Sequence, residues 1–431
     1  MHKYFTFNTL IFICSFCFAQ QPTPAARQVN TISLKNAKIH IGNGNVLMNS
    51  QITFKDGKIT YVGANRTESQ ETEIINCEGK EVYPGFIAPN STLGLTEIEA
   101  VRATNDFNEV GSNNGSTRAL VAYFTDSKVI PTVRTNGVLM AQVTPRGGLF
   151  SGQSSVVQLD AWNWEDAVIK ADEGIHLNWP KMISSLYNDD TEQSSKEKNK
   201  SYDKSIQIIT KYLQDAASYA KNNNIEKNLL LDAAKGLLDG SKILYVHANE
   251  PREITDAITI CKKNNVSKIV IVGGSSSYLI AEFLKQNNVA VMLQRPHSLP
   301  NRPDDDIDLP YKNAKLLFDA GILFCLQNEG DMEAMNTRNL PFLAGTCVAY
   351  GLPYEQAVSA ITSNTAKILG IESICGTIET GKDATLFVSD GDALDMKSNN
   401  VKLAFIRGRN IELTNIQTEL NKKYKNKYEL K

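Results

Sequence analysis

The alternation of apolar and polar positions divides the chain into two kinds of segment. Near both ends, apolar and polar residues alternate with a period of two, over residues 32–41, 51–62, 74–82, 376–388 and 401–411. This period is typical of half-buried strands, and Asp56-Gly57 indicates a hairpin turn inside the second segment. Because such segments stand at both ends, the pattern predicts one small β domain built from both ends of the chain.

The middle of the chain has a different pattern, in which short apolar runs are followed by amphipathic segments. The apolar runs cover residues 138–143, 243–247, 268–272, 289–293 and 322–326, and helical periodicity covers 206–219, 251–264, 277–286 and 312–320. Buried strands that alternate with helices predict βα units around a parallel sheet. Residues 84–369 have the length of a (β/α)8 barrel, which typically takes about 250 residues or more. The strongly polar residues 188–204 predict an exposed insertion.

The first residues have the pattern of a secretory signal peptide. Lys3 precedes an apolar run over residues 5–18 that is too short to span a bilayer, and Cys17 and Ala19 are small residues before a cleavage point at Gln20. A membrane anchor or a lipid on Cys14 or Cys17 fits this pattern less well. The sequence therefore predicts a periplasmic or secreted mature protein with no stable membrane insertion.

Charge and cysteine usage exclude two classes of protein. The 431 residues carry 45 basic and 47 acidic side chains, and this balance excludes a nucleic-acid binder of the usual basic type. The five cysteines beyond the signal segment are scattered and lack CxxC spacing, which argues against a disulfide framework.

Motifs at both ends of the central segment resemble a known family. Tyr83-Pro84-Gly85-Phe86-Ile87 stands where the first β segment passes into the first barrel strand. Residues 338–342, 349–353 and 360–370 have the pattern of last barrel helices, and residues 376–384 that of the return into the β domain. Together these motifs resemble the amidohydrolase superfamily, particularly its imidazolonepropionase-like and dihydroorotase-like branches. The resemblance implies an α/β fold, a (β/α)8 TIM-like barrel with a small composite β-sandwich domain.

The resemblance also implies domain boundaries. Residues 1–19 are the expected signal peptide, residues 20–83 and 370–431 the two parts of the β domain with a charged tail, and residues 84–369 the barrel.

Metal-dependent members of this family begin their metal site with His-x-His on the first strand, where residues i and i+2 face the same side. Here Asn90 and Thr92 occupy those two places, and neither an amide nor a hydroxyl replaces an imidazole as a zinc ligand. His247 matches the histidine expected after the fifth strand and is the one metal ligand that the resemblance supports. The implied cofactor is zinc or another divalent metal if the chain is active, with a metal-free site as the alternative.

Other candidate residues follow the apolar runs. Glu329 and Asp331 come after the eighth strand and are the candidate general acid and base, with His297 on the loop after residues 289–293 as a further catalytic candidate. On that loop Arg302 is a candidate ligand contact.

A glycine-rich loop supplies the remaining candidates. Arg146, Gly147 and Gly148 follow an apolar run, and their backbone N–H groups have the pattern of an anion-binding nest or of a tight structural turn.

Two functions follow from these observations. The first is an exported hydrolase of C–N bonds in cyclic-amide-like substrates, with an incomplete metal site. The second is a non-catalytic homologue that binds a small ligand or pairs with an active amidohydrolase. In either case the expected partner is a small-molecule substrate or ligand and not a nucleic acid. The chain could also form a homo-oligomer or pair with another amidohydrolase.

Overall fold

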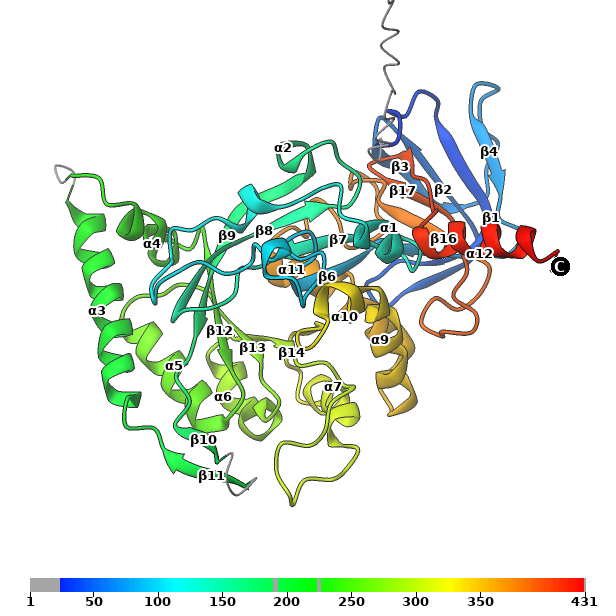
Figure 1. The fold of residues 1–431 in the computed structure, drawn as a ribbon. Coiled ribbons are helices and arrows are strands. Elements are labelled where there is room, and N and C mark those ends of the chain that lie inside the picture. The colour runs from blue at the N-terminus through cyan, green and yellow to red at the C-terminus, as the bar shows by residue number, and fades with distance from the viewer. Residues whose placement is uncertain (1–23, 189–192, 223–225, 430–431) are drawn as a thin grey trace, which may run out of the picture.

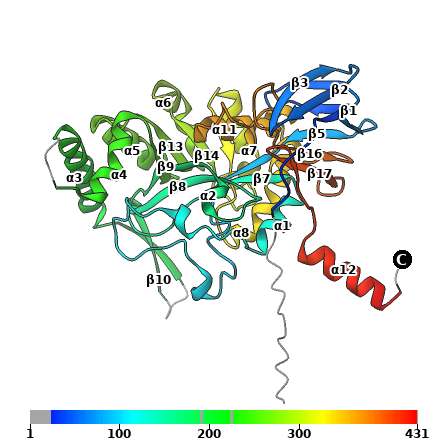
Figure 2. The same cartoon turned by 90° about the horizontal axis from the view of Figure 1, so that it is seen from above.

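The computed structural model describes residues 24–188, 193–222 and 226–429. The expected signal peptide lies outside the described residues. Figure 1 shows a sheet built from the blue and the orange-red ends of the chain, beside a larger body built from the cyan-to-yellow middle. The view from above in Figure 2 shows the same division.

The β domain is one sheet to which both ends of the chain contribute. Its strands follow the order β18, β17, β16, β5, β1, β2 and β3, and β4 and β5 pair with successive stretches of β1. The turn between β2 and β3 contains Asp56 and Gly57, both at positive φ, as the hairpin prediction requires. The strands are β1 (Ile32–His40), β2 (Val46–Lys55), β3 (Lys58–Ala64), β4 (Glu73–Asn76), β5 (Glu81–Pro84), β16 (Leu386–Ser389), β17 (Val401–Ile406) and β18 (Arg409–Asn410).

The central body contains the predicted barrel as a second eight-stranded sheet. Its order is β15, β14, β13, β12, β9, β8, β7 and β6. Strand β8 runs antiparallel to both neighbours, and all other neighbouring pairs are parallel. The strands are β6 (Phe86–Ser91), β7 (Val138–Val143), β8 (Phe150–Gln158), β9 (Val168–Asn178), β12 (Ile243–Ala248), β13 (Ile269–Gly273), β14 (Ala290–Leu293) and β15 (Phe324–Leu326).

Helix α11 (Ser363–Leu369) closes the barrel between its two edge strands. The backbone N–H of Ile87 on β6 donates to the carbonyl of Ile361, just before this helix, at 2.9 Å. The side-chain amide of Asn364 in the helix donates to the carbonyl of Phe324 on β15 at 3.1 Å. The edge groups of both strands are thus satisfied by the helical segment rather than by each other.

Helices cover the outside of the barrel, as the βα pattern predicts. Among the described residues, no helix is both long and apolar enough to cross a membrane. The remaining helices are α1 (Val129–Arg134), α2 (Trp164–Ala167), α3 (Tyr202–Lys221), α4 (Leu229–Asp239), α5 (Pro251–Lys263), α6 (Ala281–Gln286), α7 (Leu309–Asp319), α8 (Glu333–Asn336), α9 (Leu340–Ala349), α10 (Tyr354–Ala360) and α12 (Ile416–Lys427).

The polar insertion contains a two-stranded antiparallel hairpin, β10 (Ile183–Asn188) and β11 (Gln193–Lys198). The sequence predicts only an exposed segment here, because these strands lack the apolar alternation of a half-buried sheet. The hairpin lies close to the start of α5, since the backbone N–H of Met182 just before β10 donates to Oε1 of Glu253 at 2.8 Å.

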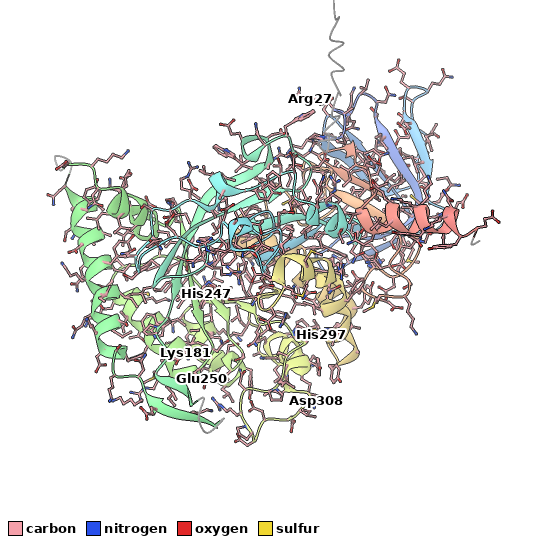
Figure 3. The ribbon with its side chains drawn as sticks, in the orientation of Figure 1. Arg27, Lys181, His247, Glu250, His297 and Asp308 are labelled. Carbon is pink, nitrogen blue, oxygen red and sulfur yellow. The ribbon has the colours of Figure 1, made fainter. Side chains whose placement is uncertain are left out.

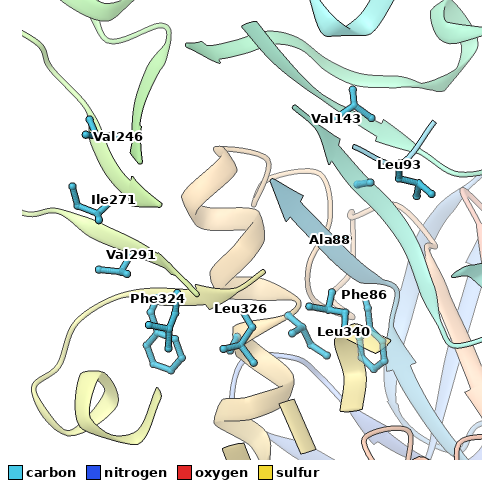
Figure 4. Packing of buried hydrophobic residues seen from close by; sticks show 14 of the residues in the cluster. Phe86, Ala88, Leu93, Val143, Val246, Ile271, Val291, Phe324, Leu326 and Leu340 are labelled. Carbon is cyan, nitrogen blue, oxygen red and sulfur yellow. The ribbon is translucent and has the colours of Figure 1, made fainter. Parts of the chain in front are cut away.

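The apolar core joins the barrel strands to the covering helices. Figure 4 shows Phe86, Val246, Ile271, Phe324 and Leu340 among its members, drawn from strands on both sides of the barrel and from helix α9. Burial of each such side chain stabilises the fold by about 1.5–3 kcal/mol. The five cysteines in the described residues are all free and buried.

Candidate functional site

An open cleft of about 1520 Å³ lies at the carboxyl ends of five barrel strands, β9, β12, β13, β14 and β15. The hairpin β10–β11 and the first turn of α5 form its walls. Figure 3 shows His247 near the end of β12, with Lys181 and Glu250 toward the hairpin. This is the end of a barrel at which loops position functional groups.

Glu329, His247 and His176 form a chain that leads from the cleft into the barrel. Oε1 of Glu329 lies 3.7 Å from Nδ1 of His247, and both residues line the cleft. Nε2 of His247 shares a hydrogen bond with Nδ1 of the fully buried His176 at 2.9 Å. The His176 ring stacks on Tyr245 with a centroid distance of 4.6 Å, so the innermost member of the chain is fixed by packing.

Arg146 holds the carboxamide of Asn90 beside this chain. One guanidinium nitrogen donates to Oδ1 of Asn90 at 2.9 Å, and the other donates to its backbone carbonyl at 2.9 Å and to Oε1 of Glu333 at 2.8 Å. The Asn90 amide nitrogen in turn donates to Oε2 of Glu329 at 2.9 Å. Arg146 therefore acts on Glu329 through Asn90.

The charges of this cluster set the ionisation of its members. Burial by itself would raise the pKa of Glu329, but the interactions of its carboxylate with His247, Arg146 and the Asn90 amide lower it to about 2. Burial by itself would lower the pKa of Arg146, but the negative charges of Glu333 and Glu329 raise it. Burial, together with the proximity of His247 and of the Arg146 guanidinium, holds the pKa of His176 well below its usual value. The cluster thus combines a fixed carboxylate, a fixed guanidinium and a neutral imidazole.

A layer of buried polar side chains supports the cluster from inside the barrel. Glu173 is fully buried and accepts hydrogen bonds from Gln142 at 2.7 Å, from Ser154 at 2.5 Å and from the Tyr245 hydroxyl at 2.7 Å. The Gln142 side-chain oxygen accepts from the backbone N–H of Asn90 at 2.9 Å. Burial raises the pKa of Glu173. This layer fixes the end of strand β6 from which Asn90 projects.

The residues present do not fit the divalent metal that the resemblance implies. Within the part of the chain that the structure describes, no three His, Cys, Asp or Glu side chains are arranged so that they could hold a metal ion. Asn90 and Thr92 are both buried, and the Asn90 carboxamide oxygen, the group that could coordinate a cation, accepts from Arg146. His247 and His176 are hydrogen-bonded to each other. No step through a metal is therefore derived for this site.

The structure separates some of the predicted candidates from the cleft. Asp331 is exposed, and its backbone carbonyl accepts a hydrogen bond from Asn336 at 3.2 Å. His297 is exposed too, and its Nε2 pairs with the Thr346 hydroxyl at 2.8 Å. Neither lines the cleft. The loop after β14 reaches the cleft instead with Arg302, which donates to Glu250 at 2.8 Å.

The glycine-rich loop lies against other chain segments. The Gly148 carbonyl accepts from the Asn178 amide at 2.8 Å, and a Cβ on Gly147 would lie 2.0 Å from Oδ1 of Asn108. Both glycines have positive φ, which favours the tight-turn alternative for this loop. The residues that follow form strand β8, in which the hydroxyl of Ser154 donates to the buried Glu173.

Sequence reasoning missed two of the site's main members, His176 and Glu173. Both lie on β9, whose polar residues break the apolar run by which the other strands are found. The available signal is the alternation at the end of β9: Ile175 and Leu177 lie on one face, so His176 lies on the other.

Comparisons with known proteins agree with this architecture. A model of the amidohydrolase family matches residues 210–411. The 5'-deoxyadenosine deaminase of Methanosarcina mazei is 23% identical over 372 residues, which cover 79% of each chain. The imidazolonepropionase of Flavobacterium psychrophilum is 24% identical over 225 residues, 46% of this chain and 54% of that protein.

The fold has a solved counterpart as well. The crystal structure of an amidohydrolase from Thermotoga maritima superposes with a TM-score of 0.78 at 24% identity, over 88% of this chain and 99% of that one. The family match and the relatives support the amidohydrolase superfamily for this chain, and the solved structure shows the same fold.

Proposed function

We propose that the cleft binds a small molecule with a cyclic amide, amidine or peptide-like group, and that Glu329 anchors an N–H donor of this ligand. The observation that carries the proposal is the position of the Glu329 carboxylate in the wall of the cleft, oriented by His247 and Asn90. Family membership and relatives that act on C–N bonds support this ligand class. The signal-peptide pattern of residues 1–19 supports binding outside the cytoplasm.

The ionisation of Glu329 favours binding over proton abstraction. A carboxylate with a pKa of about 2 stays ionised at neutral pH and forms charge-assisted hydrogen bonds. The same low pKa makes it a weak base, because general-base catalysis is most efficient when the pKa lies near the working pH. A ligand that offers an N–H group or a cationic nitrogen therefore fits this carboxylate better than a water molecule that must lose a proton.

Thermal unfolding of the full chain tests the proposal, with hydantoin, dihydrouracil and benzamidine as probes. A ligand present at one hundred times its Kd stabilises the native state by about 2.7 kcal/mol, so at least one probe should raise the unfolding temperature. Glu329→Gln removes the anionic acceptor and should abolish the rise. The control is Glu197→Gln, an exposed carboxylate on the hairpin wall of the same cleft, which should retain it. No rise with any probe, or a rise that survives Glu329→Gln, would contradict the proposal.

A second candidate is hydrolysis of the bound C–N bond, and the chain of Glu329, His247 and His176 favours it. His247 shares a hydrogen bond with His176 and lies 3.7 Å from Glu329 in the cleft wall, and adjacent acid and base groups of this kind can transfer protons. Ring opening of hydantoin or dihydrouracil in the same samples would support this candidate, provided that His247→Asn abolishes it. If a probe binds but its ring does not open, the function is ligand binding without hydrolysis.

A further inference from the structure

Arg146 places a permanent positive charge at the carboxyl end of the first barrel strand. This is where the family resemblance implies metal-ligating histidines and where this chain has Asn90. We infer that the Arg146 guanidinium is the resident cation of this site: it takes the place of a divalent metal, keeps Glu329 and Glu333 charge-balanced, and orients Glu329 through Asn90. The inference deepens the proposed function, since it concerns the same carboxylate, but it does not depend on which ligand binds.

The hydrogen bonds of Arg146 show that it is built into the site. Its three bonds to Asn90 and Glu333 are all between 2.8 and 2.9 Å, and its side chain is only 17% exposed. The same Glu333 oxygen also accepts from the backbone N–H of Thr92 at 2.8 Å. The guanidinium is therefore held by the ends of β6 and by the start of α8, and not by solvent.

An asparagine at position 90 suits this arrangement better than an imidazole. A carboxamide presents an acceptor oxygen and a donor nitrogen on the same carbon, so Asn90 accepts from Arg146 and donates to Glu329 at once. Its backbone lies at φ 49°, a left-handed conformation that asparagine tolerates well. Arg146 also binds the carbonyl of this same residue, which holds the strained conformation in place.

The loop after Arg146 gives the glycines of the sequence motif a structural role. Gly147 and Gly148 lie at φ 81° and 64°, so the chain turns directly after Arg146. The backbone N–H of Arg146 donates to the carbonyl of Phe107 at 2.7 Å, and the segment after Phe107 covers the loop. The glycines thus position a guanidinium rather than bind an external anion.

Electrostatics explains why the guanidinium and a metal exclude each other. Arg146 faces two carboxylates, Glu329 and Glu333, and cannot lose its proton at any working pH. A divalent cation among the same carboxylates would meet this charge at short range in a site shielded from water. Removal of the Arg146 charge leaves Glu329 and Glu333 without their counter-ion and open to another cation.

Cobalt(II) chloride, used alone, tests the inference on the full chain. Each protein is incubated with the metal and desalted, and the cobalt retained per chain is measured together with its visible absorption and the unfolding temperature. The wild type should retain no stoichiometric cobalt. Arg146→Gln, which can still hydrogen-bond to Asn90 but carries no charge, should retain more cobalt per chain than the wild type and unfold at a higher temperature with the metal.

Two further variants complete the comparison. Arg146→Lys keeps the charge and should behave as the wild type does, and so should the control Arg118→Gln, whose arginine pairs with Asp172 outside the site. Stoichiometric cobalt in the wild type would overturn the inference, and so would equal cobalt contents in the wild type and Arg146→Gln.

A spectroscopic measurement distinguishes a role of Arg146 in positioning Glu329 from a role in folding alone. Carbon-13 NMR of the Glu329 carboxylate should give a higher pKa in Arg146→Gln than in the wild type, and Arg146→Lys should restore the low value. An unchanged Glu329 pKa in Arg146→Gln would overturn the role of Arg146 as the counter-ion. Stabilisation by hydantoin is measured in a separate experiment. If hydantoin fails to stabilise the protein but the cobalt contents are as expected, only the proposed function is rejected.

Discussion

The side chains that define this site each connect two partners. Asn90 joins Arg146 to Glu329, and His247 joins Glu329 to His176. The sequence could predict Arg146, His247 and Glu329 as site residues because each follows an apolar run, and the family resemblance pointed to the position of Asn90. It could not predict that His176 belongs with them, because a partner on a neighbouring strand depends on sheet register, which no local pattern reveals.

The buried layer below the site yields a prediction about one hydroxyl group. In Tyr245→Phe, Oε2 of Glu173 loses the only hydrogen bond that the structure gives it among the described residues. A buried acceptor without a partner costs about 1–3 kcal/mol, so the free energy of unfolding in urea should fall by that amount. Tyr61→Phe is the control, because the Tyr61 hydroxyl donates to the Ala64 carbonyl at the surface and its loss should change little. Equal effects of the two substitutions would contradict the prediction.

Strands and helices were predictable where burial is uniform. Strands β7, β12, β13, β14 and β15 are apolar runs because their side chains contact core on both faces. The period of two in β1 and β2 reflects one apolar face and one polar face, and the polar side chains of Ser33, Gln51 and Thr53 are also buried and hydrogen-bonded to one another. Strands β8 and β9 escaped prediction because the barrel interior here is polar, with serine, glutamine and glutamate side chains bonded to one another. The residues of the hairpin β10–β11 lack the period-two alternation by which a strand is recognised.

One histidine links elements of the two domains. His40 on β1 lies 2.7 Å from Glu355 of α10 through Nδ1 and 3.1 Å from Glu81 of β5 through Nε2, and its ring stacks on Tyr83. Both contacts are hydrogen bonds to carboxylates, so the imidazolium form satisfies both ring nitrogens. Burial lowers the pKa of His40, but the hydrogen bonds and charges of Glu355 and Glu81 outweigh it, and the pKa is raised. The hydrogen bond from His40 lowers the pKa of Glu81 to about 2.

These shifts predict how stability depends on pH. Because the pKa of His40 is raised in the folded state, its contribution is complete below about pH 6.5 and is lost as the pH rises through the folded value. Because the pKa of Glu81 is depressed, its contribution is present above about pH 4.5 and is lost as the pH falls toward 2. His40→Gln should cost about 3–5 kcal/mol near pH 5.5 and less at pH 8, measured by urea unfolding. The exposed His297→Gln is the control, and a cost of His40→Gln that does not change with pH would refute the link.

At the scale of the whole molecule, the barrel and the β domain share one aromatic junction. Strand β16 comes from the far end of the chain and pairs with β5, directly before the first barrel strand. Its Phe387 stacks on Tyr83 at a centroid distance of 5.4 Å and meets Phe86 edge-on at 4.9 Å. The barrel residue Gly137 lies so close that a Cβ on it would come within 2.6 Å of the Phe387 ring. Phe387 therefore fills the space between the two domains from the β-domain side.

This junction predicts that the two domains unfold together. Phe387→Ala leaves a cavity between them and should destabilise the fold by about 3–5 kcal/mol. All three tryptophans, Trp162, Trp164 and Trp179, lie in the barrel, so their fluorescence reports on barrel unfolding alone. If the junction couples the domains, this β-domain substitution lowers the urea midpoint of the tryptophan signal, and circular dichroism follows the same single transition. If the tryptophan midpoint stays at its wild-type value, the stability of the barrel does not depend on the β domain, because a cavity in an uncoupled β domain would destabilise only that domain.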